Sequence, residues 1–245
     1  MAEQIGFMGL GALGLPIATN LLDSGYALTV YNRTASKADP LVKRGACLVS
    51  QPADTVTSGG VVVNVMWDIA AVESVVTSDG FLERLGPGGI HISMCKGSPD
   101  GARRLAELHA KHGCIYVEAP VFGRPEAAEA RKLWIPVSGP RAAKDRVQPL
   151  FTAMGAQGVF DFGEEIGSAT MVKLAGNFLM ISAVTSLREA LTVTEMAGVD
   201  AKATLDMLTQ TLFPSPIYQN YGTMIVEKQR ALSRSAIPSK RPRPV

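Results

Sequence analysis

The sequence predicts an α/β fold, with a doubly wound, mostly parallel β-sheet followed by an all-α domain that contains one long helix. Apolar runs rich in β-branched residues alternate with helix-compatible segments through the first two thirds of the chain, as in parallel sheets with crossover helices. A glycine-rich turn follows the first of these runs. Residues 168–197 then contain no proline and a single glycine, which indicates an unbroken helix.

The individual elements follow from these patterns. Residues 61–66 have the sequence Val-Val-Val-Asn-Val-Met, a continuous run that suits a strand buried on both faces. Glycines are expected to end three helices, at Gly25, Gly45 and Gly113. The expected strands span 4–9, 27–32, 46–49, 61–66, 89–93, 114–118, 133–138 and 157–161. The expected helices span 14–25, 36–44, 69–78, 99–112, 141–154, 168–197, 200–212 and 217–229.

We therefore expect a sheet domain over residues 1–163 and a helical domain over 164–232. Residues 233–245 are rich in Ser, Pro, Arg and Lys, a composition typical of a disordered tail, and this tail is basic. The helix at 168–197 is apolar nearly all round and needs cover on several faces. The rest of the chain is too short to supply all of that cover, which predicts a homodimer formed through the helical domain.

Composition narrows the class of protein. The net charge is +2 and the basic residues do not gather on the body of the chain, so no nucleic-acid partner is expected. The three cysteines, Cys47, Cys95 and Cys114, have neither disulfide nor metal-ligand spacing, which favours free thiols in the cytoplasm and no metal site. A strand begins at once, leaving no room for a signal peptide. Charges interrupt the apolar stretches, so no membrane span is expected.

The glycine turn predicts a dinucleotide site of the Rossmann type, formed by residues 9–14. Gly9 permits the tight turn out of the strand, Gly11 lets the backbone approach a pyrophosphate, and Gly14 lets the helix pack on the strand. The helix start offers unpaired N–H groups to phosphates. The expected contacts are Gly9, Leu10, Gly11, Ala12, Leu13 and Gly14. A structural turn in another α/β fold is the alternative.

The end of the second strand predicts NADP rather than NAD. NAD sites usually carry an acid there, which binds the ribose 2′-hydroxyl. This chain has Asn32, Arg33 and Thr34 at that point, with Lys37 close behind. A guanidinium can hold a 2′-phosphate through two charge-assisted hydrogen bonds. We expect Arg33 to be the main anchor; the alternative is that Arg33 and Lys37 are ordinary solvated charges.

Two polar residues lie on an otherwise apolar part of the long helix. Lys173 and Asn177 are four residues apart and therefore lie on one face, one turn from each other. An ammonium group there could stabilise the developing alkoxide of a carbonyl substrate and donate a proton to it. A lysine that merely extends its head group to water is the alternative.

Four ordered segments resemble the β-hydroxyacid dehydrogenases, the superfamily of 3-hydroxyisobutyrate and 6-phosphogluconate dehydrogenases. They are GFMGLGALGLPIATNLL, NRT, EAPVFGRPEAAEARKLWIPVSGP and GSATMVKLAGNF, within residues 4 to about 228. The resemblance implies a dimer and hydride transfer between NAD(P) and a hydroxyacid or its oxo form. It makes Lys173 the catalytic residue and Asn177 a substrate-binding residue.

The same resemblance locates the other site residues and the departures from the family pattern. The substrate loop, usually Asp-Ala-Pro-Val-Ser-Gly-Gly, retains Gly123 but has Phe122 and Arg124 beside it. Phe122 would narrow the pocket, whereas Arg124 could hold an anion or point to solvent. Ser98 matches a substrate-binding serine, while Cys95 and Lys96 depart from the pattern. Lys96 would lie near the nicotinamide, where it could contact the cofactor or an acidic substrate, or damage the site.

Two further expectations come from the resemblance. Val65, Met66 and Trp67, at the end of a strand, would flank the cofactor, although Trp67 could be a packing residue. Family members usually continue past the position of Gln229 with more helices, so the helical domain looks truncated, which puts activity in doubt.

The leading hypothesis is thus an NADP-dependent oxidoreductase acting on a small carbonyl or hydroxyacid of the 3-hydroxyacid or semialdehyde type. One alternative is an imine reductase, from a branch that shares the NRT segment but typically lacks the catalytic lysine. The other alternative is a catalytically impaired NADP-binding protein.

Overall fold

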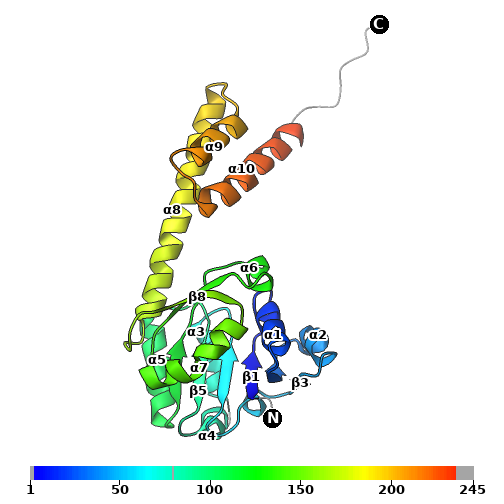
Figure 1. Cartoon of the computed structure of the whole chain (residues 1–245), viewed down its shortest axis with the longest axis vertical. Coiled ribbons are helices and arrows are strands. Elements are labelled where there is room, and N and C mark those ends of the chain that lie inside the picture. The colour runs from blue at the N-terminus through cyan, green and yellow to red at the C-terminus, as the bar shows by residue number, and fades with distance from the viewer. Residues whose placement is uncertain (1–2, 79, 236–245) are drawn as a thin grey trace. The chain divides into compact units, whose positions relative to one another are not determined.

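The computed structural model describes residues 3–78 and 80–235 (Figure 1). The described residues divide into two compact units, with the division between Leu174 and Ala175. The first unit contains a six-stranded sheet with the order β3-β2-β1-β4-β5-β6, in which every pairing is parallel. This is the strand order of a dinucleotide-binding fold, and it confirms the predicted Rossmann-type sheet. The strands are β1 Gln4–Met8, β2 Ala27–Tyr31, β3 Cys47–Leu48, β4 Val61–Asn64, β5 Ile90–Ser93 and β6 Ile115–Glu118.

Both faces of the sheet are buried, as the continuous apolar strands predict. Ile5 and Phe7 of β1 pack on one face with residues of α1 (Gly14–Asp23) and α7 (Arg141–Ala153). Met8 of β1 and Val62 of β4 pack on the other face. That second face is covered by α3 (Ile69–Val76), α4 (Phe81–Leu85) and α5 (Pro99–Lys111). The alternation of side chains along each strand therefore supplies two cores at once.

A smaller sheet follows, formed by β7 (Leu133–Val137) and β8 (Ala156–Asp161), which pair in parallel. Two antiparallel bridges link this part of the chain to β6 and its following loop: Glu118, at the end of β6, pairs with Ser138 after β7, and Phe122 pairs with Trp134 of β7. The chain therefore doubles back after β6, so that the predicted substrate loop lies directly beside β7.

Several short elements were missed by the sequence patterns. They are α4, α6 (Pro125–Glu129) and a 3-10 turn at Pro52–Thr55. The helix expected at 36–44 is present as a 3-10 turn, Ala35–Ala38, followed by α2 (Asp39–Val42). The stretch between the strands expected at 114–118 and 133–138 contains α6, which begins with proline at its first position, where the missing N–H costs nothing. Elements of one turn carry too little periodicity to be found from sequence.

The helical part consists of α8 (Ser168–Met196), α9 (Ala201–Gln210) and α10 (Pro216–Ser235). Leu187 and Leu191 of α8 form a small core with α9 and α10, and α9 and α10 lie beside the later turns of α8 (Figure 1). The compact units divide inside α8 rather than in the loop before it, where the sequence placed the domain boundary. Helix α10 extends to Ser235, so it includes the first residues of the expected tail, whereas 236–245 lie outside the described residues.

By length and composition, α8 could also cross a lipid bilayer, since its most apolar window has a mean hydropathy of 1.3. This differs from the expectation that charges would exclude such a span. One helix of this kind is weak evidence for a membrane protein, because core helices of soluble proteins meet the same criteria.

Candidate functional site

The glycine turn between β1 and α1 has a separate steric reason for each glycine. Gly9 has a φ of +93°, and a Cβ on it would lie 2.4 Å from the carbonyl oxygen of Val65. A Cβ on Gly14 would lie 1.9 Å from the carbonyl oxygen of Gly9, so a larger residue would push α1 off the sheet. A Cβ on Gly11 would meet nothing within 4 Å. The space beside Gly11 is thus open, as the approach of a pyrophosphate requires.

The start of α1 is suited to an anion. Leu13 stands at the N-cap of α1, and its side chain makes no hydrogen bond to the first amides of the helix. These amides are the groups that an anion can bind. The turn itself is tied to the end of β2, because the Leu10 N–H donates to Oδ1 of Asn32 at 2.8 Å. The side-chain amide of Asn32 in turn donates to the Thr34 carbonyl at 2.8 Å. Asn32 therefore orders the turn instead of pointing freely into solvent.

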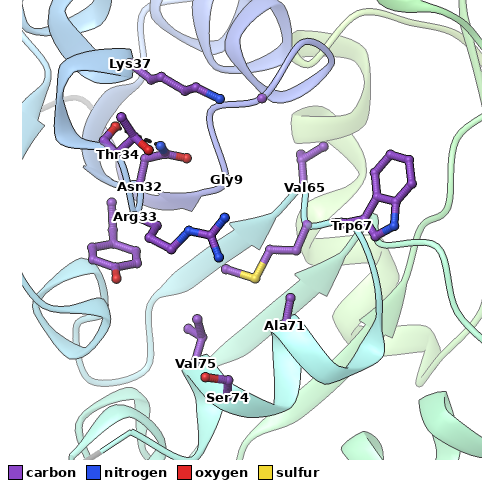
Figure 2. Close-up of a pocket in the computed structure, with 13 residues that line it drawn as sticks. Gly9, Asn32, Arg33, Thr34, Lys37, Val65, Trp67, Ala71, Ser74 and Val75 are labelled. Atoms are coloured by element: carbon purple, nitrogen blue, oxygen red, sulfur yellow. Dashed lines mark hydrogen bonds between the residues drawn. The ribbon is translucent and has the colours of Figure 1, made fainter.

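A groove of about 420 Å³ opens beside this turn. Its size is in the range of sites for small molecules and cofactors. Figure 2 shows the Arg33 side chain extending into the groove and Lys37 approaching it near the glycine turn. Arg33 and Lys37 are the cations among the 13 lining residues, and none of those residues is acidic. The groove is therefore electrostatically suited to a phosphorylated ligand.

The structure brings most of the predicted cofactor residues to this groove. Its lining includes Gly9, Gly11, Asn32, Arg33, Thr34, Lys37, Val65, Met66 and Trp67. The predicted residues outside the lining are Leu10, which is buried, Ala12, Leu13, Gly14 and Lys96. Four further lining residues were not predicted from the sequence: Tyr31, Ala71, Ser74 and Val75. Ala71, Ser74 and Val75 lie at i, i+3 and i+4 on α3 and therefore share one face of that helix. The spacing of these residues in the helix after β4 could have indicated that they line the groove together.

Lys173 lies in the second turn of α8, within the first compact unit. Its ammonium Nζ is 4.0 Å from the centre of the Phe122 ring, a distance typical of a cation–π contact. Burial, together with the positive charge of Lys96, lowers the pKa of Lys173 to about 8. Both causes disfavour the charged form, so the amine can release or take up a proton close to neutral pH.

The remaining predicted substrate residues differ in their surroundings. The Ser98 hydroxyl accepts a hydrogen bond from the Gly101 N–H and caps α5, which is a structural use of that oxygen. The exposed guanidinium of Arg124 forms an ion pair with Glu126, with Nε 3.5 Å from the carboxylate. Gly123 has a φ of +148°, and a Cβ there would lie 2.5 Å from the Leu133 side chain. Asn177 lies one turn beyond Lys173 on α8, in the second compact unit.

Parallel pairing places these groups along one edge of the main sheet. The carboxyl ends of β1, β2 and β4 carry the glycine turn and the groove. Lys96 follows the carboxyl end of β5, and Phe122 follows that of β6. Since the order is β2-β1-β4-β5-β6, the groove and the lysine site occur in sequence along the edge at which such sheets bind ligands.

Comparison with known proteins identifies the family. Residues 4–170 match the family described as the NAD binding domain of 6-phosphogluconate dehydrogenase. The chain belongs to this family. Membership confirms the resemblance to the hydroxyacid dehydrogenases and makes the chain a dehydrogenase of the NAD(P)-dependent type.

Relatives of this dehydrogenase family match most of the chain. An uncharacterized oxidoreductase, YfjR, of Bacillus subtilis is 40% identical over 92% of this chain and 79% of its own length. Glyoxylate/succinic semialdehyde reductase 1 of Arabidopsis thaliana is 30% identical over 89% and 75%. A solved reductive aminase from Aspergillus terreus, in complex with NADPH and ethyl-5-oxohexanoate, is 27% identical with a TM-score of 0.74, covering 96% of this chain and 77% of that one.

Proposed function

We propose that this dehydrogenase uses NADP to transfer a hydride to or from a small substrate of the 3-hydroxyacid or semialdehyde type, with Lys173 as its general acid and base. The observation that carries the proposal is the half-buried ammonium of Lys173, which lies over Phe122 on the same sheet edge as the glycine turn. The similarity to a glyoxylate/succinic semialdehyde reductase supports the substrate class.

Two sets of residues would hold NADP in the groove. The open space at Gly11 and the amides at the start of α1 would hold the pyrophosphate. Arg33 and Lys37 would hold the 2′-phosphate, since an acid that would repel it is absent from the groove lining. When bound, the reduced nicotinamide supplies the hydride for the reaction.

Lys173 would manage the proton of the reaction. With a pKa of about 8, most Lys173 side chains are protonated at pH 7 and can donate to the oxygen of a carbonyl that is being reduced. In the oxidative direction, the neutral amine would remove the hydroxyl proton. General acid–base catalysis of this kind contributes roughly 10²–10⁴-fold to rate. Gly123 would offer its backbone N–H to a substrate carboxylate.

The test is turnover of succinic semialdehyde and glyoxylate with NADPH in wild type and Lys173→Met. The variant is expected to lose turnover while binding NADPH as wild type does, because the lysine does not line the groove. Lys111→Met, at an exposed position of α5, is the control and should turn over normally. Near-wild-type turnover by Lys173→Met would refute the assignment. NADPH binding by wild type without turnover of any small aldehyde would favour the impaired NADP-binding protein.

Imine reduction is the second candidate, favoured by the similarity to the solved reductive aminase. The same panel should therefore include a cyclic imine. Preferential turnover of the imine over the semialdehyde would replace the first proposal with the second.

We further infer that the protein is a cytoplasmic homodimer formed through the helical part. Phe178, Leu179 and Ile181 are each more than 60% exposed, which is unusual for a cluster of large apolar residues on one helix. Light scattering coupled to gel filtration should give twice the chain mass, and the double variant Phe178→Asp/Ile181→Asp should give the monomer mass.

A further inference from the structure

We propose that Glu118 is a positioning residue for Lys173: its carboxylate binds the start of α8 and thereby determines where the lysine lies relative to the loop at 119–124. The proposal rests on the assignment of Lys173 as the general acid. It concerns a residue that makes no contact with the groove.

The carboxylate of Glu118 is buried and accepts three hydrogen bonds, two from the start of α8 and one from the end of β7. The side chain is at the carboxyl end of β6, and the residue is 1% exposed. Its Oε1 accepts from the Thr170 hydroxyl at 2.5 Å, and its Oε2 accepts from the Gly167 N–H at 2.5 Å. Oε2 also accepts from the hydroxyl of Ser138, which follows β7. Glu118 thus joins β6, β7 and α8 at one point.

These contacts together act as an N-terminal cap of α8 supplied by the sheet. The Ser138 hydroxyl, while donating to Glu118, accepts from the Ala169 N–H at 3.3 Å. The N–H groups of Gly167 and Ala169 are among the amides at the helix start that lack a carbonyl one turn earlier. A carboxylate at this end of the helix is also favoured by the helix dipole. The sheet therefore holds the first turn of α8 by its polar groups.

The link to Lys173 comes from two successive contacts between the same pair of segments. Glu118, just before the loop, contacts Thr170 of α8. Phe122, four residues after Glu118, contacts Lys173, which is three residues after Thr170. The two contacts set the axial position and rotation of the first turns of α8 along the loop. If the first contact is lost, the helix start is free to shift or rotate, and the ammonium leaves its place over the Phe122 ring.

A neighbouring charge explains why this position matters for chemistry. Lys96, after β5, is the charged side chain whose field acts on Lys173, and Phe122 is the ring that covers its ammonium. A lysine that moves away from Lys96 and toward water regains a higher pKa. The location of the helix start therefore controls the proton affinity of the lysine.

The experiment measures the pKa of Lys173 directly, through the pH dependence of its acetylation by acetic anhydride, followed by peptide mass spectrometry. This readout needs no turnover. Wild type, Glu118→Gln and Thr170→Val are compared, with Lys202 of α9 as the internal reference in each sample. Glu107→Gln and Thr152→Val are matched controls at exposed positions of α5 and α7.

We expect the Lys173 pKa to rise by at least one unit in both Glu118→Gln and Thr170→Val and to stay at the wild-type value in both controls. The kcat for semialdehyde reduction should fall at least tenfold in Glu118→Gln, with unchanged NADPH affinity. Glu118→Asp keeps the charge but shortens the side chain. It should show a smaller rise in the Lys173 pKa and a smaller fall in kcat than Glu118→Gln.

An unchanged Lys173 pKa in Glu118→Gln and Thr170→Val would overturn the proposal, even if both variants had lower melting temperatures. If Glu118→Gln does not fold, the result for Thr170→Val alone tests the proposal, because this substitution removes one hydroxyl and leaves the side-chain volume nearly unchanged. A rise in the Lys173 pKa without any wild-type turnover would uphold the positioning role and refute the proposed reaction, so the two failures are distinguishable.

Discussion

A chain of hydrogen bonds through the buried sheet predicts that mild acid destabilises this protein. His109 of α5 donates from Nδ1 to the Leu105 carbonyl at 2.6 Å, and its Nε2 lies 2.8 Å from Nδ1 of His91 on β5. Nε2 of His91 lies 2.7 Å from the side-chain amide of Asn64 on β4. A carbonyl can only accept, so Nδ1 of His109 carries a proton. When both rings are neutral, Nε2 of His109 accepts from the Nδ1–H of His91, and Nε2 of His91 accepts from the Asn64 amide. Protonating either ring would place two donors face to face.

Both histidines are held neutral by burial. Desolvation is the main cause that lowers the pKa of His109 from 6.5 to about 4, and it lowers the pKa of His91 well below 6.5. The unfolded chain therefore binds protons below pH 6.5 that the native protein does not bind, so stability falls as pH falls through this range. At pH 5, His109 alone should cost about 2 kcal/mol relative to pH 7.5, and His91 acts in the same direction.

The assay is urea unfolding followed by circular dichroism at pH 7.5, 6.0 and 5.0. His109→Gln, which retains a donor and an acceptor but cannot titrate, should reduce the loss of unfolding free energy between pH 7.5 and 5.0 by about 2 kcal/mol. Lys111→Gln, an exposed position on the same helix, should keep the wild-type loss. A loss in His109→Gln within about 0.5 kcal/mol of wild type would refute the reasoning, since that is the error expected for independent sites.

Three further predictions concern the site. Arg33→Ala should weaken NADPH binding roughly 10–100-fold, the equivalent of one charge-assisted contact, and leave NADH binding within about threefold of wild type. Arg44→Ala, at an exposed position, is the control. An equal loss of affinity for both cofactors would contradict a 2′-phosphate role for Arg33. The kcat/KM for carbonyl reduction should fall as pH rises through about 8, and the kcat/KM for alcohol oxidation should rise over the same range. The reason is that Lys173 must be protonated for reduction and neutral for oxidation. A kcat/KM for reduction that is flat from pH 7 to pH 9.5 would rule out Lys173 as the general acid. Trp67, 81% exposed and part of the groove lining, should lose fluorescence when NADPH binds; Trp67→Phe should abolish the change, whereas Trp134→Phe should preserve it.

Much of the fold was predictable because its signals are local. The steric requirement at Gly14 comes from the carbonyl of Gly9, five residues earlier, and the buried strands appear in the sequence as apolar runs. The groove residues from β1, β2 and β4 followed from the same logic, since parallel strands end at one edge. Their predicted roles as cofactor contacts remain predictions.

Other features depend on partners far apart in the chain. Two roles were open to Arg124, and the structure pairs it with Glu126. Ser98, expected at the substrate, caps α5. Nothing in the local pattern indicated that Glu118 accepts a hydrogen bond from Thr170, 52 residues away.

The glycine turn, the cationic end of the second strand and the succession of buried strands can be read from the chain, since each is specified by neighbouring residues. Which buried polar groups meet depends on how the chain folds. Glu118 with α8 and His91 with His109 are pairings that exist because burial removes water and leaves each donor to find an acceptor inside the fold.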